Sequence, residues 1–129
     1  MHRALLLGLV GMAIETAFTA VQDSWNKRDL SLLGSVSLWM FPIYAIGLSW
    51  GFDFVEWSIP TWWVRWLSYP LWIWGVELLV GLPAQWAGVE IWNYAHRFEW
   101  HWRGIIAPGT APVWIAFGVL VEWIRRAVA

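Results

Sequence analysis

Residues 71–104 read LWIWGVELLVGLPAQWAGVEIWNYAHRFEWHWRG. The first part is a hydrophobic run with a single carboxylate, Glu77, one helical turn before Gly81. The second part, from residue 90 to Gly104, is crowded with aromatic and charged side chains. An apolar helix followed by such a segment is typical of a membrane-spanning helix that leaves the bilayer at its interface. We therefore predict an integral membrane protein with an aromatic interfacial loop over residues 90–104.

The composition of the whole chain supports a membrane protein. Hydrophobic residues make up 60% of the 129 positions and charged residues 13%, whereas soluble domains have about 45–50% and about 25%. So few charges cannot cover the surface of a soluble domain. A net charge of −1 offers no basic surface for nucleic acid. The absence of cysteine excludes disulfides and thiolate metal ligands.

Four segments are long enough to span a bilayer, which needs about 20 mostly apolar residues. They cover residues 4–21, 30–52, 66–89 and 108–128. The first 13 residues also resemble a signal peptide, but the apolar run continues beyond Glu15 to Val21 and favours a transmembrane helix. We predict one transmembrane domain over residues 1–129, an all-α four-helix bundle.

Tryptophan and arginine residues indicate how this bundle lies in the membrane. Indole rings favour the headgroup level, and the interfacial loop contains Trp92, Tyr94, Trp100 and Trp102. Basic residues are divided equally between the two sides of the predicted topology. The adjacent Arg125 and Arg126 at a helix end favour cytoplasmic termini, and we expect the protein to reside in the cell membrane.

The chain also shows signs of an internal repeat of two helices. Gly34 is followed by Pro42 and Tyr44, and Gly104 by Pro112 and Trp114, with the same spacing. Each unit opens with a helix that carries one glutamate. The fold is therefore either a simple four-helix bundle or two repeated two-helix units.

Three glutamates lie inside predicted spans, and they are the candidate substrate-binding or ion-binding residues: Glu15, Glu77 and Glu122. Glu15 and Glu77 each lie about 16 Å along their segments, near the middle of the bilayer. A carboxylate there costs at least about 2.5 kcal/mol, so each must face the bundle, become protonated or find a partner. The alternative is that all three only fix helix packing, with Glu122 paired to Arg126 one turn later.

Glycines share helix faces with these glutamates. Gly11, Gly81 and Gly118 each lie three or four residues from Glu15, Glu77 or Glu122. A glycine beside a carboxylate lets a neighbouring helix approach closely. We predict that these three glycines mark helix-packing contacts.

Other kinds of site have little support in the sequence. The spacing of His96, Glu99 and His101 matches no standard metal-ligand pattern. Histidines at the edges of the bundle do not suit haem ligation. Nucleotide-binding motifs and a Ser-His-Asp pattern are absent from the sequence. We predict no metal, no cofactor and no catalytic residue.

The order of these residues resembles the ABC-transporter type IV (CmpB-like) family of small integral membrane proteins. The resemblance rests on Glu15, Gly34, Pro42-Ile43-Tyr44, Glu77 with Gly81, Trp92-Asn93-Tyr94, Gly104 and Glu122, and covers the chain from Gly11 to Trp123. Ala45 stands where the family tends to have glycine, and Asn93 replaces the acidic residue of its loop. The resemblance implies a small membrane protein with glutamates inside its helices.

Two functions remain open at this point. One is a transport or permeation component, or a membrane ligand-binding component, that uses glutamates near the bilayer midplane. The other is a non-catalytic accessory subunit whose tryptophans pack against lipid, pigment or a partner protein. The expected partners are the lipid bilayer and either copies of the same chain or other membrane subunits, with no nucleic acid. A membrane enzyme that acts on lipids is less well supported, because only the glutamates favour it.

Overall fold

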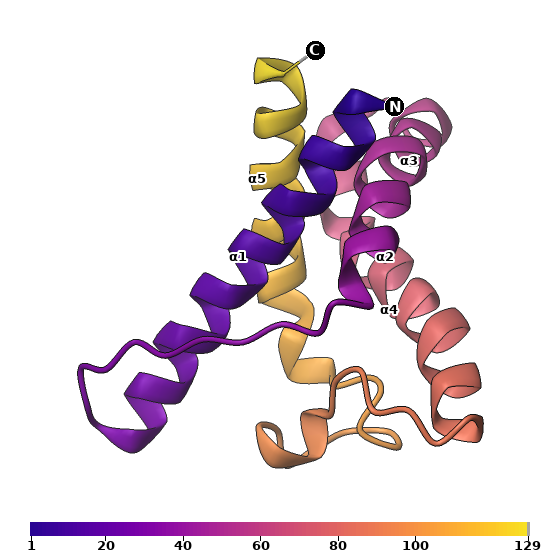
Figure 1. Ribbon diagram of the computed structural model, residues 1–129. Helices are drawn as coiled ribbons and strands as arrows, with labels where there is room; N and C mark the ends of the chain where they lie inside the picture. Colours follow the sequence, from indigo (N-terminus) through magenta and orange to yellow (C-terminus); the bar gives the residue numbers. More distant parts are fainter. Residues whose placement is uncertain (129) are drawn as a thin grey trace. The chain divides into compact units, whose positions relative to one another are not determined.

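The computed structural model describes residues 1–128, and the fold over these residues is helical (Figure 1). The five α-helices are α1 (His2–Lys27), α2 (Met40–Ile46), α3 (Phe52–Ser58), α4 (Trp62–Trp86) and α5 (Ala111–Ala127). A π-helical turn, Gly47–Gly51, joins α2 to α3 without a break, so the chain forms four helical segments. Short 3-10 turns occupy Tyr94–His96 and Pro108–Thr110. The predicted all-α class is confirmed for the described residues.

Two of the helices, α1 and α4, are long and apolar enough to cross a membrane, judged by length and composition. Helix α1 has 26 residues and α4 has 25. Both start earlier in the chain than the predicted spans at residues 4–21 and 66–89, and α4 ends earlier, at Trp86. Helix α5 is shorter, with 17 residues. We therefore describe a helical protein with two candidate membrane spans.

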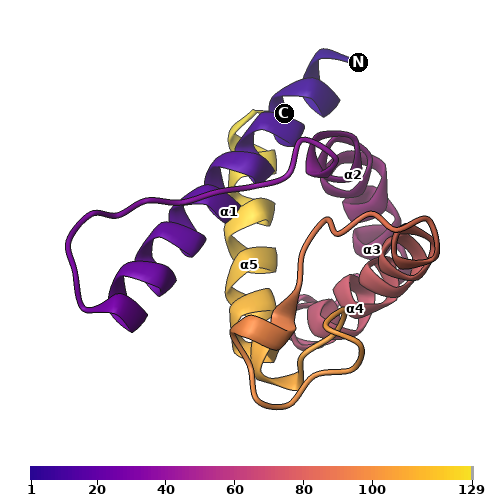
Figure 2. The same cartoon turned by 60° about the horizontal axis from the view of Figure 1, so that its bottom comes forward.

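The predicted helical span over residues 30–52 is wrong for its first ten residues, 30–39. Residues 28–39, here called the strap, are non-helical and run back alongside α1 (Figures 1 and 2). Arg28 caps the C-terminal end of α1 with a left-handed backbone (φ 54°). The following N–H, of Asp29, donates to the carbonyl of Ser24. The second helical segment begins only at Met40 and continues to Ser58, beyond the predicted end at Phe52.

Hydroxyl groups on α1 hold the strap in place and explain why it is not a helix. The Thr19 hydroxyl accepts a hydrogen bond from Ser35 N–H (2.9 Å) and donates one to the Ser35 carbonyl (3.1 Å). The Ser24 hydroxyl accepts from Leu32 N–H (2.9 Å). Gly34 lies so close to the Thr16 carbonyl that a Cβ atom would clash with it. Backbone groups that a helix would pair internally are therefore satisfied by α1 instead.

The chain divides into two compact units, residues 1–54 and 55–128. In the first unit α1 packs on α2 through glycines. Gly11 lies directly against the ring of Tyr44, and a Cβ atom at Gly8 would lie 3.0 Å from the Phe41 ring. The small residues of α1 thus make room for the aromatic residues of α2.

In the second unit α4 packs on α5, and the linking loop folds back against α4. Gly118 of α5 lies against the ring of Tyr69 on α4. The Trp74 indole N–H donates to the Thr110 hydroxyl (3.0 Å), and the Trp92 indole N–H donates to the Ile105 carbonyl (3.0 Å). The loop connects the end of α4 to the start of α5 (Figure 2). Its aromatic residues therefore help to close one end of this unit.

Candidate functional site

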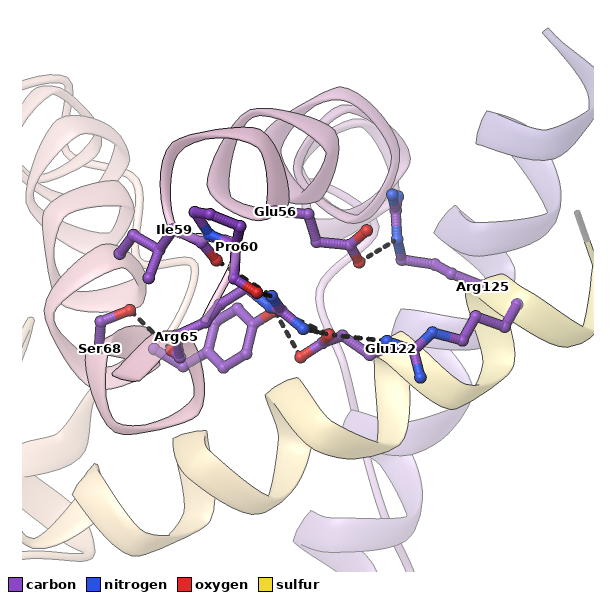
Figure 3. Close-up of polar contacts among 9 residues, drawn as sticks. Glu56, Ile59, Pro60, Arg65, Ser68, Glu122 and Arg125 are labelled. Carbon is purple, nitrogen blue, oxygen red and sulfur yellow. Dashed lines mark hydrogen bonds and ion pairs between the residues drawn. The ribbon is translucent and has the colours of Figure 1, made fainter. Parts of the chain in front are cut away.

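A buried charge cluster in the second unit surrounds Glu122. The Arg65 guanidinium donates to Glu122 Oε1 from Nε (3.0 Å) and from Nη2 (2.5 Å). The Tyr69 hydroxyl donates to Glu122 Oε2 (2.9 Å). Glu122 is 0% exposed and Arg65 is 5% exposed. Both carboxylate oxygens of Glu122 are therefore occupied by groups from α4 (Figure 3).

The remaining nitrogen of Arg65 fixes the turn before α4. Its Nη1 donates to the carbonyls of Ile59 (3.0 Å) and Pro60 (3.2 Å), between α3 and α4 (Figure 3). The planar guanidinium has donors in several directions, so one side chain can join this turn to α5. A ligand that approached Glu122 would have to displace Arg65 or Tyr69. The geometry therefore favours the packing interpretation for Glu122.

Two further arginines of α5 extend the cluster. The ion pair between Glu122 and Arg126 that the spacing predicts is present, at 3.6 Å. Arg125 is buried and its Nε lies 3.5 Å from Glu56 Oε1 on α3. Figure 3 shows Arg125 and Glu56 beside the cluster. Ion pairs thus join α5 to α3 through Arg125 and Glu56 and to α4 through Glu122 and Arg65.

The sequence did not indicate that Arg65 and Tyr69 meet Glu122. The positions of Arg65 and Glu122 relative to the ends of their helices are the signal that could have predicted this pair. Arg65 lies three residues after the start of α4 and Glu122 five residues before the end of α5. In neighbouring antiparallel helices these offsets, about 4.5 Å and about 7.5 Å, place the two side chains at a similar level.

Glu15 has a different environment in the first unit. The Tyr44 hydroxyl donates to Glu15 Oε2 at 2.5 Å. Tyr44 is buried and its ring also covers Gly11, one turn earlier on α1. One tyrosine therefore contacts both the predicted packing glycine and the predicted site glutamate of α1.

Glu77 lies in the middle part of α4 and is 7% exposed. Residues three or four positions apart share a helix face. Two such neighbours of Glu77, Trp74 and Gly81, contact the folded loop. Trp74 bonds to Thr110, and a Cβ atom at Gly81 would lie 2.7 Å from a side-chain carbon of Ile105. The face of α4 that carries Glu77 is thus the face covered by residues 105–110.

The four interfacial residues divide into a packed pair and an exposed pair. Trp92 is half-buried against Gly81, and Tyr94 makes an edge-to-face contact with Phe98 at 5.7 Å between ring centroids. Trp100 is 78% exposed and Trp102 is 50% exposed. The guanidinium of Arg103 lies 5.3 Å from the ring centroid of Trp102. Packing within the unit therefore accounts for the aromatic side chains at Trp92 and Tyr94, but it does not account for the exposed one at Trp100.

Within residues 1–128, no three histidine or acidic side chains lie close enough together to hold a metal ion. His101 instead has a local role, because its Nδ1 accepts a hydrogen bond from Gly104 N–H (2.9 Å). This bond supports the left-handed backbone of Gly104 (φ 69°).

Comparison with known proteins returned no matching family model, no matching curated protein and no matching solved structure.

Proposed function

We propose that this chain is a small membrane protein that binds an ion or a polar or cationic ligand inside the membrane, as a transport, permeation or ligand-binding component. The observation that supports this function best is the buried carboxylate of Glu77, within a candidate membrane span. An ionisable group at such a depth is costly, and in membrane proteins it commonly belongs to a substrate or proton pathway.

Burial inside a candidate membrane span makes Glu77 the best candidate of the three glutamates. Glu122 holds Arg65 and Tyr69 on its two oxygens, and Glu15 accepts from Tyr44. Glu77 shares its helix face with Gly81, and a Cβ atom at Gly81 would lie 2.7 Å from an apolar side-chain carbon of Ile105. A low-dielectric wall strengthens the attraction between a carboxylate and a cation or proton. We assign Glu77 the main binding role and Glu15 a supporting one.

The replacement Glu77→Gln tests this function, because it preserves shape and removes the charge. Protein extracted gently from its own membranes is analysed by native mass spectrometry for bound small molecules. Purified protein in vesicles loaded with the pH dye pyranine is then assayed for proton flux. We expect the wild type to retain a stoichiometric ligand or to carry protons, and Glu77→Gln to lose that property.

Glu99→Gln is the matched control, since it removes a carboxylate from an exposed position of the loop. It should behave as the wild type in both assays. If Glu77→Gln also matches the wild type in assembly, bound mass and proton flux, the proposed binding role is wrong.

A second candidate function is an accessory subunit of a larger membrane complex. The observation in its favour is Trp100, a large apolar side chain that is 78% exposed. Exposed aromatic residues are common anchors for membrane interfaces and for partner proteins. Replacement of Trp100 and Trp102 by alanine should then reduce co-purification of a partner from the native membrane. Unchanged co-purification would count against this function.

The membrane arrangement and the family remain part of the proposal. We propose four membrane crossings in a cell-membrane protein with cytoplasmic termini. We also propose association with further copies or other subunits, since four helices alone enclose little space. The ordered positions of Glu15, Glu77, Gly104 and Glu122 support membership of the CmpB-like family. The two-helix repeat is supported by the division of the chain at residue 54, which leaves one glutamate-bearing long helix in each unit.

A further inference from the structure

A pocket of about 200 Å³ lies at the C-terminal end of α4, within the second unit. Its floor is the end of the helix, where Gly81, Ala84 and Gly88 present little or no side chain. Its walls come from the loop that follows. The pocket contains neither the Glu122 cluster nor Glu77, so it is separate from the sites described above.

Three polar side chains line this pocket, Gln85, Glu90 and Asn93, and the amide nitrogens of Gln85 and Asn93 each donate one hydrogen bond within the protein. The Asn93 amide nitrogen donates to Glu90 Oε1 (2.6 Å), while Asn93 Oδ1 accepts from Ala95 N–H (2.9 Å). The Gln85 amide nitrogen donates to the Arg103 carbonyl (2.6 Å). The Glu90 carboxylate and the Gln85 amide oxygen are acceptors available to a ligand, and Glu90 is the one lining group with a formal charge. The pocket therefore suits a ligand that donates hydrogen bonds or carries positive charge.

Electrostatics favours a cation at the same place. The C-terminal end of a helix carries a partial negative charge, and the last turn of α4 contains no basic residue to offset it. Glu90 adds a formal negative charge, and none of the residues that line the pocket is Lys, Arg or His. An anionic ligand would thus meet repulsion from both the helix end and the carboxylate.

The remaining walls are apolar, which distinguishes an organic cation from a metal ion. Trp92, Val89, Ile91 and Ile105 line the pocket beside the acceptors. Indole rings attract cations, and recognition of alkylated ammonium groups commonly combines an aromatic wall with a carboxylate. We propose that this pocket binds a small alkylammonium group of the choline or ethanolamine type, either as the free amine or as the headgroup of a zwitterionic phospholipid.

Saturation-transfer NMR on the CH₂ and CH₃ protons of choline and ethanolamine tests the free amine. The protein is kept in a maltoside detergent, which has no ammonium group. We expect a dissociation constant on the order of 1 mM for a ligand of this size. Glu90→Gln should weaken binding by about tenfold, because it removes the negative charge that attracts the cation. Ala84→Leu fills the floor of the pocket without a change of charge and should abolish binding.

Native mass spectrometry from nanodiscs with equal parts phosphatidylethanolamine and phosphatidylglycerol tests the headgroup. If the pocket takes the lipid, the wild type retains phosphatidylethanolamine in preference to phosphatidylglycerol, and both variants lose this preference. Binding of the free amine in detergent identifies a soluble ligand instead. Glu99→Gln, on the same loop but outside the pocket, should behave as the wild type in both assays.

The proposal is overturned if neither assay detects binding, or if Glu90→Gln and Ala84→Leu bind as well as the wild type. Because Glu77 does not line this pocket, failure here would leave the proposed role of Glu77 unaffected.

Discussion

Arg65 and Glu122 lie 57 residues apart in the chain, yet the guanidinium and the carboxylate form two hydrogen bonds, of 3.0 Å and 2.5 Å, inside the second unit. Both side chains are buried. Removal of one member of a buried pair leaves the other charge without compensation. This pair joins α4 to α5 and also fixes the turn before α4 through the Ile59 and Pro60 carbonyls.

The replacement Glu122→Gln should lower the free energy of unfolding by about 3 kcal/mol, because Arg65 would remain buried without its counter-charge. Reversible unfolding in mixed micelles of maltoside and dodecyl sulfate, followed by circular dichroism, measures the change. Arg126→Gln is the control. It removes an exposed partner of the same glutamate, 3.6 Å away, and should cost less than about 1 kcal/mol. Equal effects of the two variants would contradict the assigned role of Arg65.

Gly118→Ala should destabilise the second unit by about 1 to 3 kcal/mol, because the new methyl group would overlap the ring of Tyr69. Gly75→Ala is a matched control in α4, since no atom of the described residues lies within 4 Å of a Cβ atom there. The control should be neutral or stabilising by up to about 1 kcal/mol, as alanine favours helix. Thermal unfolding of both variants in detergent measures the difference, and similar stability for the two would refute the close packing of α4 on α5.

Tyr44→Phe should destabilise the first unit by about 1 to 3 kcal/mol, because it removes the hydroxyl that donates to Glu15 and leaves the ring in place. Hydrogen exchange of the α1 and α2 amides, monitored by mass spectrometry, localises the effect. Faster exchange should appear in α1 and α2, with α5 unchanged. Glu15→Gln keeps an acceptor for the tyrosine and should have the smaller effect. The reverse order would show that the charge, not the hydrogen bond, matters.

Ser31→Ala should raise the pKa of Asp29 towards its ordinary value. In the strap, the Ser31 hydroxyl (2.6 Å) and the Ser31 N–H (3.0 Å) both donate to Asp29, and these bonds hold its pKa below that value. A lowered pKa stabilises the fold at pH values above the unfolded pKa, and this stabilisation is lost as pH falls through the folded pKa. Carbon-13 NMR titration of the carboxyl group measures the change. Ser37→Ala should leave the Asp29 pKa as it is, and an unchanged pKa in Ser31→Ala would contradict the bonds.

Single cysteines can test the proposed topology, because the natural chain has none. With four crossings, His2→Cys and Ser58→Cys lie on the cytoplasmic side and Glu99→Cys on the other. An impermeant maleimide should therefore label Glu99→Cys in intact cells, and the other two only after permeabilisation. Labelling of Ser58→Cys and Glu99→Cys from the same side would exclude a membrane crossing by α4.

The helices were predictable from the sequence where local rules decide. Long apolar runs predicted α1 and α4 to within six residues at each end, because a helix satisfies its own backbone groups. The pair of Glu122 and Arg126 follows from spacing alone, since residues four apart are neighbours on a helix. These features need no knowledge of how distant segments meet.

The strap and the partners of the glutamates were not predictable in this way. Residues 30–39 are uncharged and largely apolar, so they satisfied the test for a membrane span. Their structure instead depends on Thr19 and Ser24, which lie in another element and offer hydrogen bonds to the strap. Likewise, Tyr44 lies 29 residues from Glu15, and only the packing of α2 on α1 brings them together.

The distance in sequence between Arg65 and Glu122 has a consequence for biosynthesis. A ribosome adds about 5 to 20 residues per second, so the 57 residues that separate the two take roughly 3 to 11 s to make. During that interval α4 presents its arginine before the compensating carboxylate exists. Arg65 lies close to the start of α4, so its long side chain can meanwhile keep its charged end in water. Synthesis of α5 then supplies Glu122, so the charge that α4 carries is compensated only after the later helix has been made.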